Sequence, residues 1–459
     1  MKTIDRKWLV LIAIGTGSFM SALDASVVNT ILPILRTAFN SDVAAIEWVV
    51  TVYLLVLSGL LLSFGRLGDL RGHKSIYIWG FSIFVLSSAL CGLAWSATVL
   101  VIFRGIQAIG GAMLAANASA IVTGNFPAEQ RGRAFGLVST MTYLGLTVGP
   151  SLGGWLTHAF GWRTIFYINV PVGALALTLG LVFIPRDAPA EHGQRFDLPG
   201  AVVFMAALTA LMLGLNKGAA WGWSSPQVLG LLFGALLLLV VFIQIERSSS
   251  APMLDLSLFR NPLFSTTSIS SVLNYVCVYS IIFLMPFYLI QGRGLNPAQA
   301  GLFLSVQPIL MAIIAPISGA FSDRIGSRLP GMLGMGILAL GLFTLSFLGP
   351  DSGFWLVVLG LSVAGLGTGT FISPNTSALM GAAPRARQGI ASGVQGAARN
   401  FGMVLGIGLA GAILTTHLAQ NTPTALYSGI DQGFLVAAGI AVLGIISSAI
   451  KNEPKRGSA

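Results

Sequence analysis

The chain has 459 residues, of which 55% are hydrophobic and only 9% are charged, with 25 Lys and Arg against 15 Asp and Glu. Soluble proteins carry roughly 25% charged residues, so this composition excludes a soluble enzyme and a disordered polar protein, and it indicates a chain whose solvent is the lipid bilayer. The formal net charge of +10 does not indicate nucleic-acid binding, because the basic residues are scattered among apolar stretches and form no single patch.

The N-terminus carries Lys2, Arg6 and Lys7 ahead of an apolar run that is far longer than the roughly 7–15 residues of a signal-peptide core. We therefore expect a retained first transmembrane helix. A span needs about 20 mostly apolar residues, and the sequence predicts an all-α polytopic membrane protein with fourteen transmembrane helices. The expected spans are residues 8–35, 44–64, 75–95, 98–122, 133–157, 163–184, 199–216, 226–245, 263–291, 297–320, 330–348, 353–379, 388–415 and 431–450.

The distribution of basic residues predicts the orientation. With fourteen crossings, most Lys and Arg residues fall in segments on the same side as both termini. Cytoplasmic loops carry the excess of basic residues, so we expect a multi-pass protein of the plasma (cytoplasmic) membrane with both termini in the cytoplasm. A miscounted helix would invert every later loop, so the bias also favours the even count.

Two segments of the chain are repeated. GRLGDLRGHK begins at Gly65 and GAFSDRIGSR begins at Gly319. The matching residues are Gly65 with Gly319, Asp69 with Asp323, Gly72 with Gly326, Lys74 with Arg328, and, in a second repeat, Gly132 with Gly389, Gly136 with Gly393, Gly145 with Gly402, and Gly149 with Gly406. The sequence distance between each residue and its match is longer than six spans with their loops would require, and the excess corresponds to about two helices. The sequence therefore predicts an N-terminal six-helix bundle over 1–184, an inserted helix pair with its flanking loops over 185–260, and a C-terminal six-helix bundle over 261–459.

Four motifs resemble a known family. The loop from Gly65 to Lys74 is similar to the signature loop of the major facilitator superfamily, although here Asp69 is followed by Leu70 and Arg71 where the family more often has the arginine directly after the aspartate. RGIQAIGGA, GLTVGPSLGG and LDASVVNTILP resemble, in order, the helix 4 motif, the helix 5 antiporter motif and the helix 1 motif of fourteen-helix drug:proton antiporters. The resemblance implies a multidrug-efflux type of antiporter with rocker-switch alternating access between two pseudo-symmetric bundles.

Asp24 is the only acidic residue near the middle of an expected span. At about 1.5 Å per residue it lies about 24 Å along the first helix, inside a hydrocarbon core of about 30 Å. An ionised carboxylate there costs at least about 2.5 kcal/mol, so burial favours the neutral acid and allows proton exchange. Arg104 is expected at a similar depth, where it would favour the charged acid. The two residues predict a proton-coupling pair, and a permanent structural ion pair is the alternative.

Arg399 is expected about 16 Å into the thirteenth span, where it would neutralise an anionic substrate group or modulate the proton site; a structural pairing with backbone carbonyls is the alternative. Each further polar side chain, taken singly, is more typical of hydrogen-bonding glue between helices. The candidates for a substrate cavity are Asp24, Asn29, Asn274, Gln307, Asn375 and Arg399.

The repeated loops predict gates at the cytoplasmic helix ends, where charge networks would hold the inner side closed; topology determination by the positive-inside rule is the alternative. Their candidate residues are Gly65, Asp69, Arg71, Gly72, Lys74, Asp323, Arg324 and Arg328. The antiporter motif contributes Gly145, Gly149, Pro150, Gly153 and Gly154. The glycines spaced by four line one helix face and permit close helix approach, the proline permits a bend, and the resemblance implies a gate seal; plain packing is the alternative.

The chain has neither a Walker phosphate loop nor an HExxH zinc motif, and Cys91 and Cys277 provide no metal spacing. We expect no enzyme activity, no metal site and no cofactor, with the proton gradient as energy source. The leading hypothesis is a monomer that exports small amphipathic, drug-like or metabolite compounds; its partners would be the substrate, protons and the lipid bilayer. The alternatives are an uptake or metabolite carrier of the same fold and a non-transporting membrane scaffold or sensor.

Overall fold

The computed structural model describes residues 5–450 except 42, 188–196, 250–251, 253 and 420–423. The described residues are helices and turns, without a strand. The long helices are α1 (Arg6–Phe39), α2 (Val43–Arg71), α3 (His73–Gly92), α4 (Ala97–Asn125), α5 (Arg131–Phe160), α6 (Thr164–Tyr167) continued by α7 (Asn169–Phe183), α8 (Leu198–Trp221), α9 (Pro226–Ser248), α10 (Pro262–Pro286) continued by the π-helical η3 (Phe287–Gly292), α11 (Pro297–Leu304) continued by α12 (Val306–Ile325), α13 (Arg328–Ser346), α14 (Phe354–Ala382), α15 (Gln388–Leu418) and α16 (Ala425–Ala449). Short 3-10 turns lie at Ala128–Gln130, Leu256–Arg260 and Arg385–Arg387.

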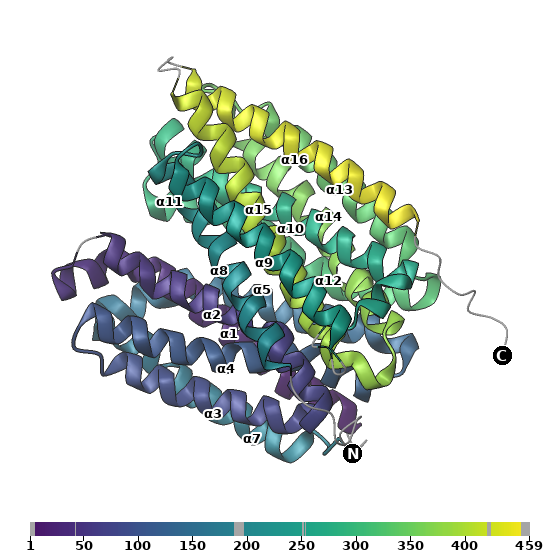
Figure 1. Cartoon of the computed structure of the whole chain (residues 1–459). Coiled ribbons are helices and arrows are strands. Elements are labelled where there is room, and N and C mark those ends of the chain that lie inside the picture. Colours follow the sequence, from purple (N-terminus) through teal and green to yellow (C-terminus); the bar gives the residue numbers. More distant parts are fainter. Residues whose placement is uncertain are drawn as a thin grey trace.

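Fourteen helical stretches are long enough to cross a membrane. Thirteen of them in the described residues are also strongly apolar, and the fourteenth is α5, which spans 30 residues but carries many Gly, Ser and Thr. The expected polytopic all-α fold with fourteen transmembrane helices is confirmed. The start of α1 and the end of α16 lie at one end of the molecule (Figure 1), which we call the termini-bearing end; the other is the opposite end.

Local sequence explains where several helices begin. Asp197, Ser225, Asn261 and Asn296 each accept a hydrogen bond from a backbone amide of the first helical turn, and a proline stands at the first or second helical position after each of them. Such side chains satisfy the unpaired amides of a helix N-terminus, and proline there loses no hydrogen bond. The boundaries of α8, α9, α10 and α11 are thus fixed by side chains outside the membrane-crossing stretch.

The buried apolar residues are organised differently at the two ends. At the termini-bearing end, one cluster joins both halves of the chain and includes Val10, Phe135 and Ile390. At the opposite end there are two separate clusters, one drawn from α1–α7 and one drawn from α10–α16. The halves are therefore packed together at the termini-bearing end, while each half has its own core at the opposite end. The predicted domain boundaries themselves stay a prediction.

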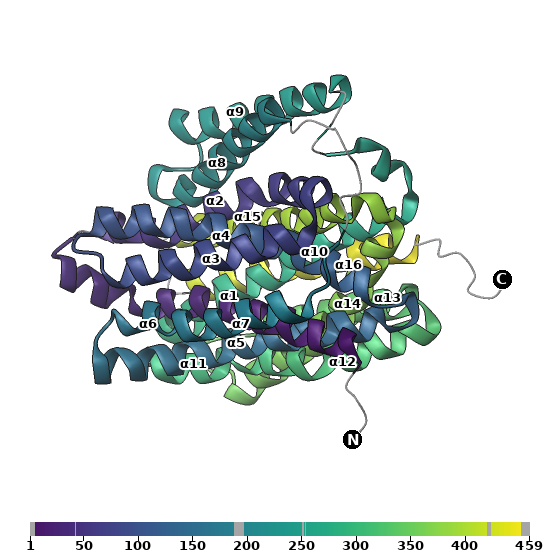
Figure 2. The same cartoon turned by 90° about the horizontal axis from the view of Figure 1, so that it is seen from below.

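The helices α8 and α9 lie beside the main body of the molecule (Figure 2). In α9 only 17% of the most apolar window is buried, and Phe233 is 70% exposed, as expected for a helix whose outer face contacts lipid. The pair is attached through α8, where a Cβ atom on Gly59 of α2 would lie 2.8 Å from Cγ of Met205. By contrast α5, the least apolar span, packs between α1 of the first half and α12 of the second half.

Candidate functional site

Asp24 lies near the middle of α1 with an exposure of only 2%. Its Oδ2 atom accepts a hydrogen bond from Nη1 of Arg104 at 2.7 Å in an ion pair. Its Oδ1 atom accepts from Nε2 of Gln107 at 3.2 Å and from Nδ2 of Asn169 at 2.8 Å. A buried charge is tolerated only when it is paired and hydrogen-bonded, and here three side chains from α4 and α7 fulfil that condition.

Arg104 is the largest fully buried side chain among the described residues. Besides Asp24 it donates from Nη1 to Oε1 of Gln107 at 2.7 Å and from Nε to the carbonyl of Val49 at 3.3 Å. Its guanidinium carbon lies 4.2 Å from the ring centroid of Tyr53, within the range of a cation–π interaction. Arg104 therefore connects α4 with α1 and α2, and Gln107 closes a three-membered network with Asp24.

Asn169 is a member of this site that sequence reasoning missed. Its Nδ2 atom donates both to Asp24 and, at 3.0 Å, to Oγ of Ser88, which in turn donates to the carbonyl of Phe166 at 2.9 Å. The sequence signal that could have found it is an amide side chain inside an apolar run, because such a group needs a hydrogen-bond partner inside the membrane. Gln107 belongs to the RGIQAIGGA segment, which as a motif did not indicate its contact with the carboxylate of Asp24.

Arg399 lies in the middle of α15 and is half-buried. Its Nε atom is 3.5 Å from Oδ1 of Asn400, and one helical turn further along α15 a Cβ atom on Gly402 would lie 2.8 Å from Cβ of Tyr275 of α10. Tyr143 and Tyr279 are near enough to feel its charge. It is therefore not part of the Asp24 network; it lies among tyrosines of α5 and α10.

The remaining amide candidates have other contacts. Nδ2 of Asn375 donates to the carbonyl of Thr267 at 3.0 Å and to Oγ of Ser271 at 2.8 Å, so it links α14 to α10. Asn274 is fully buried with Nδ2 at 3.5 Å from Sδ of Met335, between α10 and α13. Gln307 is buried beside α14, where its carbonyl lies 2.7 Å from a Cβ built on Gly365. The side chain of Asn29 lies outside the described residues.

The antiporter-motif glycines place α5 directly against the helix that carries Asp24. A Cβ atom on Gly145 would lie 2.6 Å from the carbonyl of Phe19, and one on Gly153 would lie 2.6 Å from Cγ1 of Val27. Gly149 faces Ser26 in the same way, whereas Gly154 faces open space. Pro150 lies inside the helix on its exposed side. Three glycines of the motif thus form the face on which α1 packs.

At the termini-bearing end, two aspartates cross from one half of the chain to the other. Asp69, near the end of α2, accepts hydrogen bonds from the amides of Gly389 and Ile390 at 2.8 and 3.0 Å. Asp323, near the end of α12, accepts from the amides of Gly132 and Arg133 at 2.8 and 2.9 Å. Each carboxylate therefore caps the N-terminus of α15 or α5, where unpaired amides and the helix dipole favour negative charge.

The glycines beside these aspartates bring the backbones into contact. A Cβ atom on Gly65 would collide with the carbonyl of Gly389, and one on Gly319 would collide with the carbonyl of Gly132. Both pairs join the two halves of the chain. Together with the aspartate caps, they close the termini-bearing end.

The basic residue Lys74 of the first repeated loop contacts the end of α7. Nζ of Lys74 donates to the carbonyls of Leu181 and Ile184 at 2.8 and 2.5 Å, at the end of α7. Gly72 has a φ of +90°, a conformation that favours glycine, and it turns the chain from α2 into α3. The exposed basic residues of these loops are Arg71, Arg324 and Arg328.

A further residue that the sequence did not indicate is Asp187. Its carboxylate accepts from the amides of His73 and Lys74 at 2.5 and 3.1 Å and so caps α3. His73 in turn lies with Nε2 at 3.4 Å from Oδ1 of Asp69. The loop after α2 is therefore tied both to the C-terminal half and to the segment that follows α7.

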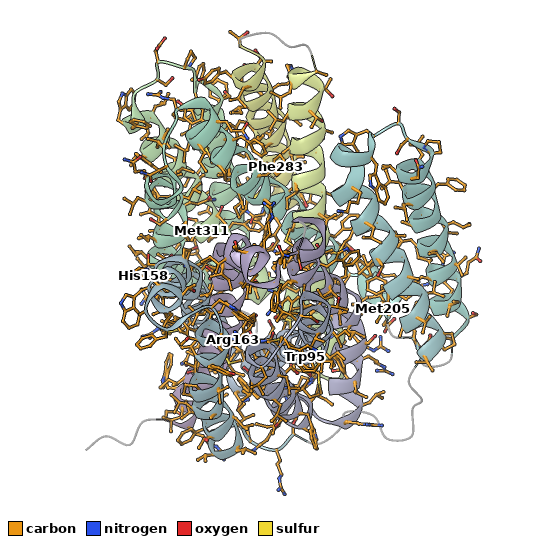
Figure 3. The ribbon with its side chains drawn as sticks, turned by 90° about the vertical axis from the view of Figure 1, so that its left-hand side faces the viewer. Trp95, His158, Arg163, Met205, Phe283 and Met311 are labelled. Atoms are coloured by element: carbon orange, nitrogen blue, oxygen red, sulfur yellow. The ribbon has the colours of Figure 1, made fainter. Side chains whose placement is uncertain are left out.

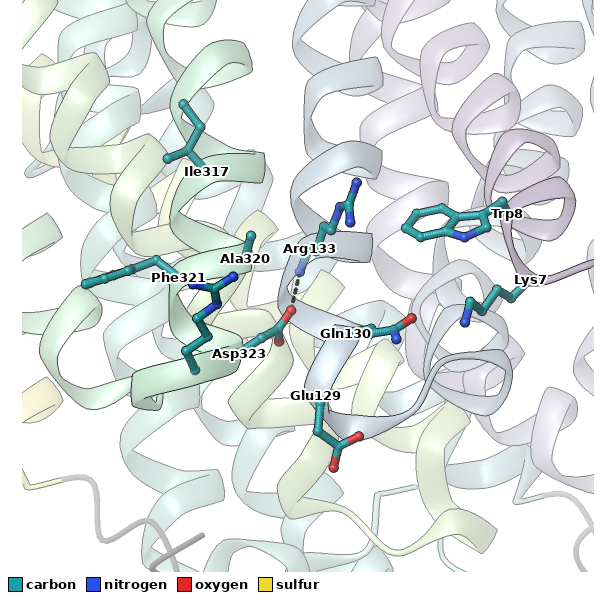
Figure 4. Close-up of a pocket in the computed structure, with 10 residues that line it drawn as sticks. Lys7, Trp8, Glu129, Gln130, Arg133, Ile317, Ala320, Phe321 and Asp323 are labelled. Atoms are coloured by element: carbon teal, nitrogen blue, oxygen red, sulfur yellow. Dashed lines mark hydrogen bonds between the residues drawn. The ribbon is translucent and has the colours of Figure 1, made fainter. Parts of the chain in front are cut away.

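A pocket of about 500 Å³ opens at the termini-bearing end between α1, α5 and α12. Figure 4 shows Lys7 and Trp8 on one side of it and Asp323, hydrogen-bonded to the amide of Arg133, on the other. It adjoins the aspartate cap and is separate from the buried Asp24 network. The opposite end is seen in Figure 3, with Trp95 in the connection before α4, Arg163 in the turn before α6, and Phe283 on α10.

Comparison with known proteins identifies relatives over nearly the whole length. The family described as the Major Facilitator Superfamily matches residues 14–407. The chain is 33% identical over 448 residues to the riboflavin transporter RibZ of Clostridioides difficile, covering 96% of this chain and 97% of that protein. It is 37% identical over 414 residues to the multidrug resistance protein Stp of Mycobacterium tuberculosis, covering 90% of this chain and 77% of that protein.

Solved structures show the same fold. The human organic anion transporter MFSD10 superposes with a TM-score of 0.68 at 16% sequence identity, covering 97% of this chain and all of that chain. The arrangement of helices is thus shared even where the sequences have diverged.

Proposed function

The chain belongs to the major facilitator superfamily of transporters, and on that premise we propose that it is a proton-coupled antiporter that exports small amphipathic compounds, drug-like or metabolite in nature. The superfamily and the relatives are transporters rather than enzymes. The chain is a multi-pass membrane protein, which we place in the cytoplasmic membrane with both termini in the cytoplasm, acting as a monomer without a cofactor.

The observation that carries the proposal is the buried network around Asp24. Its carboxylate, 2% exposed, is held by one cationic and two neutral donors, Arg104, Gln107 and Asn169. Protonation would remove the charge that the guanidinium of Arg104 balances, whereas the amides can remain bonded to the neutral acid. Protonation of Asp24 can therefore weaken the attraction between α1 and α4 while the hydrogen bonds from the two amides remain.

The proposed transport cycle uses the asymmetry between the two ends. With the termini in the cytoplasm, the closed termini-bearing end and the separate cores at the opposite end correspond to an outward-facing state. Breaking the caps of Asp69 and Asp323 would release α15 and α5 and allow the two halves to rock about the central cavity. The glycine face of α5 would transmit a movement of α1, because the two backbones are in contact.

A second candidate is an uptake or metabolite carrier of the same fold; the similarity to RibZ, a transporter of riboflavin, favours a metabolite as the substrate. The two candidates differ in the direction of net movement. Cells that produce the protein would accumulate the substrate if it is an uptake carrier and would exclude it if it is an exporter.

The proposal is tested in proteoliposomes with an imposed pH gradient and a panel of cationic, neutral and anionic compounds. The native protein is expected to move at least one compound against a proton flux, and Asp24→Asn is expected to abolish this proton-driven movement while the protein still inserts. Asp351→Asn, at an exposed turn, is the matched control and should transport normally. Full proton-driven transport by Asp24→Asn would contradict the proposal.

A further inference from the structure

A second charged site lies away from the Asp24 network, in the centre of the molecule. Arg399 of α15 lies one helical turn before Gly402, where a Cβ atom would lie 2.8 Å from Cβ of Tyr275 of α10, and the adjacent Asn400 donates to Oγ of Ser58 of α2 at 2.7 Å. Tyr53 of α2, Tyr143 of α5 and Tyr279 of α10 are the other tyrosines near enough for the charge of Arg399 to act on them. These residues come from both halves of the chain, so they lie where the halves meet.

The charge of Arg399 is not balanced by the protein. Among the described residues no carboxylate lies within ion-pair distance of it, and the buried acid Asp24 is already paired with Arg104 at 2.7 Å. Arg399 is half-buried in the middle of α15. An unpaired cation in the membrane interior is costly, and it is favoured there when a ligand supplies the opposite charge.

The tyrosines around Arg399 keep their hydrogen-bonding capacity unused. Within the described residues, no hydrogen bond joins the hydroxyls of Tyr53, Tyr143, Tyr275 or Tyr279 to another protein group, yet none of these hydroxyls is among the fully buried unsatisfied atoms. These hydroxyls therefore keep some exposure and can donate to a ligand. Buried polar groups normally have partners, so four free hydroxyls around one cation point to a ligand as the missing partner.

The walls beside this site are apolar and aromatic. Tyr143 packs in one buried cluster with Met311, Ala312 and Ile372, and Tyr275 packs against the same cluster. Aromatic rings and a methionine favour a flat, polarisable ligand. The site thus combines one cation, several hydroxyl donors and a hydrophobic wall.

We propose that this site, formed by Arg399 with Tyr143, Tyr275 and Tyr279, binds compounds that carry one anionic group beside an aromatic ring. The anion would pair with the guanidinium and accept hydrogen bonds from the hydroxyls, while the ring packs on the apolar wall. The inference rests on the proposed function as a transporter and specifies its substrate class. Tyr53 contacts the Arg104 guanidinium and also interacts with Arg399, so it links the anion site to the Asp24 network.

The test compares three compounds that share one ring system, naphthoate, naphthamide and naphthylmethylammonium, in equilibrium binding to the purified full-length protein. The native protein is expected to bind naphthoate at least about tenfold more tightly than naphthamide, the effect of a charge-assisted hydrogen bond. Arg399→Gln is expected to bring this ratio close to one, and Arg399→Lys should retain most of it. Tyr279→Phe, which keeps the ring, should weaken naphthoate binding about threefold.

The control and the outcomes separate this inference from the proposed function. Arg163→Gln removes an exposed cation at the opposite end and should leave the ratio unchanged, and unaltered naphthamide affinity shows that Arg399→Gln is folded. An unchanged ratio in Arg399→Gln, or native preference for naphthylmethylammonium, would overturn the inference. Proton flux in proteoliposomes is measured separately: a ratio that depends on Arg399 together with proton-independent movement would support the anion site and contradict the antiporter.

Discussion

Asp69 and Asp323 make the same contact in opposite directions across the molecule. Each lies near the C-terminal end of a helix in one half of the chain. Each accepts hydrogen bonds from two backbone amides at the N-terminus of a helix in the other half, at distances of 2.8 to 3.0 Å. The matched loops found in the sequence thus form a reciprocal pair of contacts, which we call the latches, and these join the two halves at the termini-bearing end.

Asn in place of either aspartate should loosen that end. Asn offers one acceptor oxygen and places an NH₂ group against an amide donor, and it lacks the charge that the helix dipole favours, a loss of about 1–2 kcal/mol. We expect Asp69→Asn to accelerate hydrogen exchange at residues 389–390, and Asp323→Asn at residues 132–133. Asp351→Asn is the control, and equal exchange in all three variants would argue against the latches.

The glycine contacts should be equally sensitive to size. Gly389→Ala would place a methyl group against the carbonyl of Gly65, and relieving such overpacking costs about 1–3 kcal/mol. A cysteine introduced at Ser119, which donates to Gln395 of the other half at 3.1 Å, should then react with maleimide about fivefold faster or more. Cys91 and Cys277 are buried and contribute little background.

Gly381→Ala provides the matched comparison for that experiment, because a Cβ atom there meets nothing within 4 Å. Its labelling rate should equal that of the parent. If Gly389→Ala and Gly381→Ala label alike, the contact between Gly65 and Gly389 does not limit opening.

The pair formed by Asp24 and Arg104 should show strong coupling in thermal unfolding. Removing one partner of a buried ion pair leaves an uncompensated charge and costs about 3–5 kcal/mol. Arg104→Met should therefore lower the Tm markedly, and adding Asp24→Asn should restore part of the loss, so that the double variant is more stable than the sum of the single effects. Strict additivity would show that the two side chains do not depend on each other.

Neighbouring glycines of α5 should behave differently. Gly153→Ala meets Cγ1 of Val27 at 2.6 Å, whereas Gly154→Ala meets nothing within 4 Å. We expect the first to destabilise the protein by about 1–3 kcal/mol and the second to be neutral or stabilising by about 0.5–1 kcal/mol, because Ala is the better helix former. Melting curves in detergent measure both, and equal shifts would contradict a glycine face directed at α1.

The lengths of the apolar runs predicted the number of helices. They also predicted α5, although it carries many Gly, Ser and Thr residues. The repeat also indicated that Asp69 and Asp323 are equivalent. The identity of their partners could not be predicted, because a backbone amide at a distant helix N-terminus leaves no mark in the residue type. The basic residues of the same loops were expected in charge networks, and in the structure Lys74 binds carbonyls at the end of α7.

The depth of Asp24 and Arg104 followed from counting residues along a helix, but their neighbours did not. Asn169 contacts Asp24 across 145 residues, and only the packing of α7 on α1 brings it there. A transmembrane helix is apolar on all its faces, so its sequence does not show which face points into the protein. Polar amides such as Asn375 and Asn274, which bond between helices, therefore look the same in the sequence as residues that line a cavity.

The position of α5 has a consequence for biosynthesis. It is the least apolar of the spans, and it packs against α1 on one face and against α12 on the other, where Thr140 donates to the carbonyl of Ala312 at 2.7 Å. Because a chain is inserted from its N-terminus, α1 is already in the membrane when α5 enters, but α12 has not yet been made. The face of α5 that packs on α12 is therefore covered only after the second half of the protein has been inserted.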